Sequence, residues 1–198
     1  MAFPVLSQPS KGAGVAPAAA TGAKKARRAD ELLTEAFEAT QDFSFMTEVS
    51  EACKLTVQIS HDLLDARGVA IMLYDIDRDE LVLESVDGVQ GAIGTRASLA
   101  NGPRGEAAIK NRLVLLSEPF PGDPLVSESP AGPVLYAPLR HDRRLFGVIQ
   151  WHRAANEVPF IADEQNLATY VAGQLAKFLS EHSKRIGFKD DEPANRRR

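Results

Sequence analysis

Two pairs of strand-like runs, each joined by a short charged turn, constrain the fold of this chain more than any other feature. In the first pair, VAIMLY and ELVLESV lie on either side of DIDRD; in the second, VLYAPL and LFGVIQWH lie on either side of RHDRR. Apolar, β-branched runs around a polar turn are typical of antiparallel hairpins. The runs of the first pair are largely apolar on both faces, which predicts a sheet that is covered on each side.

Helical patterns precede and follow the two hairpins. Residues 29–41 and 44–66 carry apolar residues at helical spacing, a short helix is expected near Pro103, and a last helix follows FIADEQNLATYVAGQLA. The apolar face expected for the first helix consists of Leu32, Leu33, Ala36 and Phe37. Helices around antiparallel hairpins predict an α+β domain.

The last helix has two adjacent apolar stripes. One is expected to face the sheet, and the other consists of Ala168, Ala172, Leu175 and Leu179. Covering a sheet needs only about 100° of a helix surface, so the second stripe predicts another apolar contact, most simply with a second copy of the chain. Deeper burial of the helix in its own domain explains the same width, and both interpretations stay open.

Charge is distributed unevenly along the chain. The net charge is −4, yet residues 1–28 hold five Lys or Arg and no acid, and three Arg close the sequence. The remainder is strongly acidic, which disfavours nucleic acid as a partner because its backbone is an anion. Low apolar content predicts flexible tails at 1–28 and 187–198, on either side of one domain at 29–186.

Targeting features are not evident in the sequence. No apolar run approaches the ~20 residues that cross a bilayer, which predicts that the chain has no membrane span. The N-terminal stretch lacks the charged start and long apolar centre of a secretory signal. We therefore expect a cytoplasmic protein.

Residues that carry chemistry are few and scattered. Cys53 is the only cysteine, which excludes internal disulfides, and its helical spacing with Val49 and Val57 favours a core position. His141 and His152 are expected roughly 25 Å apart at ~3.3 Å per strand residue, too far to bind one metal ion. Nucleophile-elbow, phosphate-loop and HExxH motifs are absent from the sequence. We therefore expect neither a catalytic nor a metal site.

A candidate anion site lies at the start of the short helix. Gly102 and Gly105 offer backbone amides there, and Arg104 adds a guanidinium, so an anionic ligand would find several donors. Glycine and proline at a helix start are equally what capping requires. Further polar residues on or near the sheet are candidates to orient a ligand: Tyr136, Gln150 and Ser85. Each of these is equally a candidate for a solvated or core-edge position.

The order of these segments resembles the GAF domain family. The matching stretches are ARGVAIMLYDIDRDELVLESVDG, NGPRGEAAIKNRLVLLSEP, VLYAPLRHDRRLFGVIQWH and FIADEQNLATYVAGQLA, and they span about residues 30–184. The resemblance implies a five- to six-stranded antiparallel sheet with the N- and C-terminal helices on one face. Loops and the short helix would cover the other face, where family members bind small molecules such as cyclic nucleotides or tetrapyrroles.

The residues that family members use for particular ligands match only in part. Cyclic-nucleotide-binding members carry an Asn-Lys pair followed by a Phe and an Asp, whereas here Glu157 follows Asn156, and Phe160 and Asp163 remain. Bilin-binding members use a pocket-side cysteine, and members that reduce free methionine sulfoxide use several cysteines. The resemblance therefore implies no particular cofactor.

The function expected from the sequence is signal transduction by binding. A GAF-like sensor would bind a small molecule, anionic if charged, and pass the change to a homodimer contact or a partner protein. The 117–133 loop or the terminal helices would carry that change. One alternative is a ligand-free adaptor, in which Met72, Tyr74 and Phe146 would fill the face under Arg104. A small-molecule enzyme on the same scaffold is a further alternative.

Overall fold

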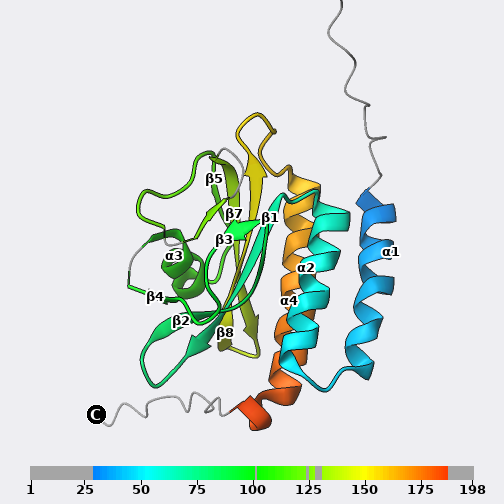
Figure 1. Cartoon of the computed structure of the whole chain (residues 1–198). Coiled ribbons are helices and arrows are strands. Elements are labelled where there is room, and N and C mark those ends of the chain that lie inside the picture. Colours follow the sequence, from blue (N-terminus) through cyan, green and yellow to red (C-terminus); the bar gives the residue numbers. More distant parts are fainter. Residues whose placement is uncertain (1–28, 101, 124, 128–130, 187–198) are drawn as a thin grey trace, which may run out of the picture.

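The structure, a computed structural model, describes residues 29–100, 102–123, 125–127 and 131–186 (Figure 1). The tails expected at 1–28 and 187–198 lie outside the described residues. The helices are α1 (Ala29–Thr40), the 3-10 helix η1 (Gln41–Phe45), α2 (Val49–Leu64), α3 (Gly102–Lys110) and α4 (Ala162–Ile186). No helix in these ranges is both long enough and apolar enough to span a bilayer.

Strands of very different length make up the β-structure. They are β1 (Gly68–Asp75), β2 (Glu80–Asp87), β3 (Val89–Gln90), β4 (Arg96–Ser98), β5 (Val114–Leu116), β6 (Val126–Ser127), β7 (Ala131–His141) and β8 (Arg144–Ala154). Six of them form one antiparallel sheet in the order β4-β2-β1-β8-β7-β5, and β3 pairs with β6 separately. The hairpins β1–β2 and β7–β8 meet along β1 and β8 at the centre of the sheet. The predicted α+β class and both predicted hairpins are confirmed.

Both faces of the sheet are covered (Figure 1). α2 and α4 pack on one face, α1 packs on these two helices, and α3 lies on the opposite face. Each face has its own core: Ile71 and Leu135 belong to the helix-side core, and their neighbours Met72 and Tyr136 belong to the α3-side core. This division follows from the period of two along a strand, which sends successive side chains to opposite faces.

The turn between β7 and β8 is set by two residues with left-handed backbone conformation. Asp142 and Arg143 have φ values of 46° and 70°. Two consecutive left-handed residues are typical of the type I′ turn, whose twist matches that of the strands it joins. The resulting register places His141 opposite Arg144, beside the turn, and His152 opposite Val134, toward the other end of the hairpin.

The structure differs from the sequence-based expectation at its helices and short strands. α2 begins at Val49 and not near residue 44, because η1 occupies residues 41–45. β3 and β4 were not predicted, since strands of two or three residues are too short to show a periodic pattern. On α1, Leu33 and Phe37 are 41% and 56% exposed. α1 packs on helices and not on the sheet, so its buried face is narrower than predicted.

Cys53 occupies the core position that its spacing predicts. It lies in the helix-side core with no exposed surface. Burial, with a smaller contribution from the negative charge of Glu84, raises the pKa of the Cys53 thiol to about 12. The thiol is therefore protonated and inaccessible in the folded protein.

Candidate functional site

Five polar side chains lie together between α3 and the sheet, and we refer to them as the Arg104–Asp123 network. They are Arg104 on α3, Asp123 between β5 and β6, Tyr136 on β7, and Gln150 and His152 on β8. Arg104 and Asp123 form an ion pair whose side chains are only 6% and 4% exposed. Charges this far from water are tolerated only as a pair, because each alone would carry a large desolvation cost.

Both carboxylate oxygens of Asp123 accept hydrogen bonds. Oδ1 accepts from Nη2 of Arg104 and, at 2.7 Å, from the backbone N–H of Leu125. Oδ2 accepts from the hydroxyl of Tyr136 at 3.2 Å. Burial, followed by the nearby charge of Asp123, raises the pKa of Tyr136, so its hydroxyl keeps its proton and remains a donor. Three donors from separate parts of the fold therefore converge on one carboxylate.

Gln150 and His152 extend the network along β8. Gln150 Oε1 accepts from Arg104 Nε at 2.8 Å, and Gln150 Nε2 lies 2.7 Å from His152 Nε2. Burial lowers the pKa of His152 to about 4, although the charge of Asp123 opposes this shift. The imidazole is therefore neutral at neutral pH.

Two glycines allow α3 to approach its neighbours closely. Gly102 has a φ of +80°, and a Cβ at this position would lie 3.2 Å from the ring of Phe120. A Cβ on Gly105 would lie 2.0 Å from the backbone carbonyl oxygen of Leu99, a contact that only glycine permits. These close contacts explain why both positions hold glycine. Contact of either glycine with a ligand stays a prediction.

The structure brings together three of the six predicted ligand residues. Arg104, Tyr136 and Gln150 all belong to the network, whereas Ser85 lies elsewhere. Ser85 pairs with Ile71, whose side chain is in the helix-side core, and directly opposed residues share a face of a sheet. A register shift after Ile71 causes this placement. The structure therefore places Ser85 on the helix side of the sheet, away from the network. The bulge that reorients it leaves no mark in the sequence pattern.

Sequence reasoning missed Asp123 and His152. Asp123 lies in the Pro-rich stretch SEPFPGDP, which has no periodicity from which a spatial neighbour can be inferred. His152 did carry a usable signal, because residues i and i+2 of a strand share a face, and Gln150 was already a candidate. The separation of His152 from His141 excluded a shared metal site but said nothing about a role beside Gln150.

The interface stripe predicted on α4 is buried inside the domain. Ala168, Leu175 and Leu179 have no exposed surface, and Ala172 is 2% exposed. α4 contacts the sheet as well as α1 and α2, so a single chain already needs a wide apolar surface on this helix. The structure thus shows the deeper burial that was left open as the alternative, and it leaves these four residues almost no exposed surface for a dimer contact.

Apolar side chains fill the α3-side face around the network. Met72 is fully buried in the α3-side core, as a filled face requires. Tyr74 packs at the edge of the same core, and its hydroxyl donates to Asp79 at 2.7 Å. Phe146, also expected on this face, lies in the helix-side core instead. The network is thus a group of polar side chains surrounded by apolar ones, and Asp123 is its internal anion.

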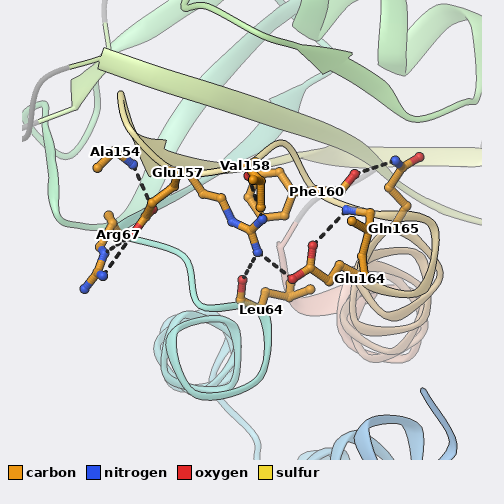
Figure 2. Close-up of polar contacts among 10 residues, drawn as sticks. Leu64, Arg67, Ala154, Glu157, Val158, Phe160, Glu164 and Gln165 are labelled. Carbon is orange, nitrogen blue, oxygen red and sulfur yellow. Dashed lines mark hydrogen bonds and ion pairs between the residues drawn. The ribbon is translucent and has the colours of Figure 1, made fainter. Parts of the chain in front are cut away.

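A second polar cluster lies on the helix side of β8. The guanidinium of Arg153 donates to the backbone carbonyls of Val158 at 2.9 Å and Leu64 at 3.1 Å, and to Glu164 at 2.6 Å (Figure 2). It also lies 4.1 Å from the centroid of the Phe160 ring. Arg153 therefore joins the end of β8 to the C-terminal end of α2 and the N-terminal end of α4.

Glu157 stabilises the turn that follows β8. It accepts hydrogen bonds from Arg67 Nε at 2.9 Å and from the backbone N–H of Ala154 at 3.0 Å (Figure 2). Its contacts here are within the chain.

A groove of about 270 Å³ lies where α1 and η1 meet α4. Its lining mixes aromatic, polar and charged side chains, and includes Phe37, Phe43, Tyr170, Lys177, Phe178 and Glu181. Leu33 and Phe45 are further exposed apolar residues of α1 and η1. This outer face is therefore a second surface available for contacts.

The contacts within the network are those of anion recognition. Arg104 and Tyr136 present donors to one anion, and the chain's only thiol, Cys53, lies on the opposite face of the sheet. Across the part of the chain that the structure describes, no three His, Cys, Asp or Glu side chains are grouped to hold a metal ion. The geometry suits a binding site for an anionic group.

Comparison with solved structures shows that this chain has the same fold as many solved GAF domains. The GAF domain of a phosphoenolpyruvate-protein phosphotransferase from Coxiella burnetii is 19% identical, with a TM-score of 0.69 over 82% of this chain and 100% of that chain. Free methionine-R-sulfoxide reductase from Neisseria meningitidis, in complex with its substrate, is 18% identical, with a TM-score of 0.68 over 82% and 96%. The second GAF domain of DevS from Mycobacterium smegmatis is 21% identical, with a TM-score of 0.60 over 71% and 100%.

Comparison with curated proteins found no match. The family model described as GAF domain matches residues 48–179, which is more than half of the chain. The match extends from the residue before α2 into α4 and includes every member of the Arg104–Asp123 network. This chain belongs to the GAF domain family.

Proposed function

We propose that this chain is a GAF sensor domain that binds a small anionic molecule at the Arg104–Asp123 network and signals by non-covalent contact. The observation that supports this best is an ion pair buried on the sheet face opposite the terminal helices. Apolar residues of similar volume often match or exceed the stability of a buried ion pair, so stability alone is a weak reason for these charges. Buried titratable groups gathered on one face of a sheet are instead typical of functional sites.

Transmission would run through β8. Gln150 and His152 belong to the network, while the next residue, Arg153, holds α2 and α4. A ligand that favours one arrangement of the network would shift β8 and, through Arg153, the terminal helices. Such a ligand must bind the two arrangements with different affinity, because equal affinity would shift no population.

The proposal assigns the chain a role by binding and not by turnover. Cys53 is fully buried with a raised pKa, and lies across the sheet from the network. An assay with free methionine-R-sulfoxide as substrate tests this directly. Turnover that disappears in the Cys53→Ser variant would contradict the proposal. The cytoplasmic location expected from the sequence stays a prediction.

Binding can be tested by thermal shift with a panel of small carboxylates, phosphates and neutral analogues. We expect at least one anion to raise the melting temperature of the wild type but not of Arg104→Ala. Arg96→Ala is the matched control, because Arg96 pairs with Asp75 and Glu80 at the exposed edge of the sheet. A response that is equal in Arg104→Ala and wild type would contradict the proposed site.

Loss of Arg104 leaves Asp123 buried without a counter-ion, so folding of the variant needs its own check. Circular dichroism reports whether Arg104→Ala is folded. Arg104→Lys retains the charge but loses the Nε donor to Gln150, and we expect it to fold and to bind the same anion more weakly. Unchanged affinity in Arg104→Lys together with unchanged affinity in Arg104→Ala would remove this residue from the site.

A second role, as a homodimer or a partner of another protein, would use the outer face of α1 and η1. Phe37 and Phe45 are 56% and 84% exposed there, and α1 carries acidic residues but no Lys or Arg. Light scattering after size exclusion should show a dimer that dissociates in Phe37→Glu and persists in Ile109→Glu, an exposed residue of α3. A wild-type monomer at all concentrations would contradict the homodimer. In that case the acidic residues of α1 favour a basic partner protein at this outer face.

A further inference from the structure

We infer that the Asp123 carboxylate occupies the place of a carboxylate ligand on Arg104, and that the site takes a small carboxylic acid which exchanges with Asp123. This inference rests on the proposed function and adds the chemical class of the ligand and the competition that controls its binding. Three observations support it: the hydrogen-bond donors around Asp123, the exposed segment that ends in Asp123, and a buried donor on His152 that has no partner among the described residues.

The donors around Asp123 match a carboxylate. Arg104 Nη2 and Tyr136 Oη donate to different oxygens of the same group, and Leu125 N–H adds a third hydrogen bond. Arg104 and Tyr136 belong to α3 and β7, so they stay in place when Asp123 moves away. A phosphate would bring more negative charge than the guanidinium of Arg104 balances, whereas the carboxylate of a ligand replaces the single charge of Asp123.

Asp123 is the buried end of an otherwise exposed segment. Residues 117–122 are exposed or half-buried, including Phe120, while the Asp123 side chain is 4% exposed. Gly122 just before it has a φ of +81°, with open space around the position of a Cβ. Leu125, two residues later, is anchored in the α3-side core. Release of Asp123 therefore requires movement of only a short stretch that has little buried surface to lose.

The exchange keeps the buried charges balanced. Arg104 would pass from the Asp123 carboxylate to the carboxylate of the ligand without being left unpaired, which avoids the largest cost in the site. Asp123 would then enter solvent, where an ionised carboxylate is well hydrated. A neutral ligand could not replace Asp123 in this way, because it would leave the charge of Arg104 buried without a counter-ion.

His152 offers the ligand a second anchor. Arg104 has only donors, so Gln150 must turn its carbonyl oxygen to Arg104 and its NH₂ group to His152. Nε2 of the neutral imidazole must then accept, and the proton lies on Nδ1. Nδ1 is buried and has no hydrogen-bond partner among the described residues. A buried donor without a partner is costly, so we place a second acceptor of the ligand at this N–H.

Chemical rescue of Asp123→Ala tests the exchange. Removing the carboxylate should open a place that acetate fills, so acetate should raise the melting temperature of Asp123→Ala in a saturable way, beyond chloride at the same ionic strength. For the same rise in melting temperature, wild type should need an acetate concentration at least about tenfold higher, because its tethered carboxylate competes with acetate. Asp75→Ala, which removes an exposed carboxylate from Arg96, is the control and should respond as wild type does.

Two results would overturn the inference. One is an acetate response of Asp123→Ala that does not exceed the chloride response, and the other is a stronger response to inorganic phosphate than to acetate. Asp123→Asn, which keeps the volume but not the charge, replaces the alanine variant if that variant does not fold. In ¹⁵N spectra of the histidine rings, the His152 proton is expected on Nδ1; a proton on Nε2 would remove the second anchor.

The outcomes also separate this inference from the proposed function. An anion that requires Arg104 but binds wild type and Asp123→Ala equally tightly would contradict the exchange and leave the sensor function standing. If no anion bound wild type, Asp123→Ala or Asp123→Asn, the sensor site itself would be contradicted.

Discussion

His152 and Arg153 are consecutive residues of β8 whose side chains lie on opposite faces of the sheet. His152 contacts Gln150 in the network under α3, and Arg153 contacts Leu64 at the end of α2 and Glu164 at the start of α4. One peptide unit therefore separates the candidate ligand face from the junction that holds the terminal helices. This arrangement follows from the alternation of side chains along a strand.

Loss of Arg153 should destabilise the domain much more than loss of Arg67. Arg153→Ala leaves Glu164 half-buried without its partner and removes hydrogen bonds to two backbone carbonyls, which should lower the free energy of unfolding by about 3 kcal/mol. Arg67→Ala removes an exposed pair with Glu157 and should cost less than about 1 kcal/mol. Urea unfolding of both variants measures the difference, and equal losses would contradict the role of the Arg153 junction.

The buried neutral imidazole of His152 should make the domain less stable in acid. Its pKa is about 4 in the folded state, below the ordinary histidine pKa of 6.5, so between these values the unfolded chain binds more protons. Stability should therefore fall as pH drops from about 6.5 to 4, by on the order of 3 kcal/mol. Unfolding curves across this range should lose this component in His152→Asn and retain it in His141→Asn. The same pH dependence in both variants would contradict the assignment.

Glycine at position 105 should be required, whereas glycine at 173 should not. Gly105→Ala places a Cβ against the Leu99 carbonyl, so α3 must shift, at a cost of about 1 to 3 kcal/mol. Gly173→Ala lies within α4, where nothing stands within 4 Å of the new Cβ, and should stabilise the protein by roughly 0.5 to 1 kcal/mol. A melting temperature of Gly105→Ala that does not fall would show that α3 tolerates the side chain.

The Cys53 thiol should react only when the domain opens. It is fully buried, and its pKa of about 12 leaves almost no thiolate at neutral pH. Iodoacetamide labelling followed by mass spectrometry should be slow in buffer and fast in denaturant. Rapid labelling of the folded protein would contradict the core position.

Much of the fold could be predicted because its long elements are periodic. The two hairpins, the helix at α3 and the core position of Cys53 follow from alternation, turn residues and helical spacing. The wide apolar surface predicted on α4 is present, but the sequence could not show whether another helix or a second chain covers it. Leu175 and Leu179 are buried because other helices lie against them, which is a property of the assembled layers.

The candidate site was predicted only where its residues lie on regular elements. Arg104, Tyr136 and Gln150 lie on a helix and two strands, and a face can be assigned to such residues from the sequence. Asp123 comes from a stretch without periodicity, and a bulge moves Ser85 to the other face. The internal anion could not have been predicted, because it depends on the path of the chain between β5 and β6.

Native mass spectrometry of the full chain, purified from its own source, tests the central claim most directly. We expect wild type and Arg96→Ala to retain the added mass of a small acid, and Arg104→Ala produced in the same way to lack it. The same added mass on all three proteins, or none on any of them after incubation with the small-molecule fraction of the same cells, would contradict a ligand site at the Arg104–Asp123 network.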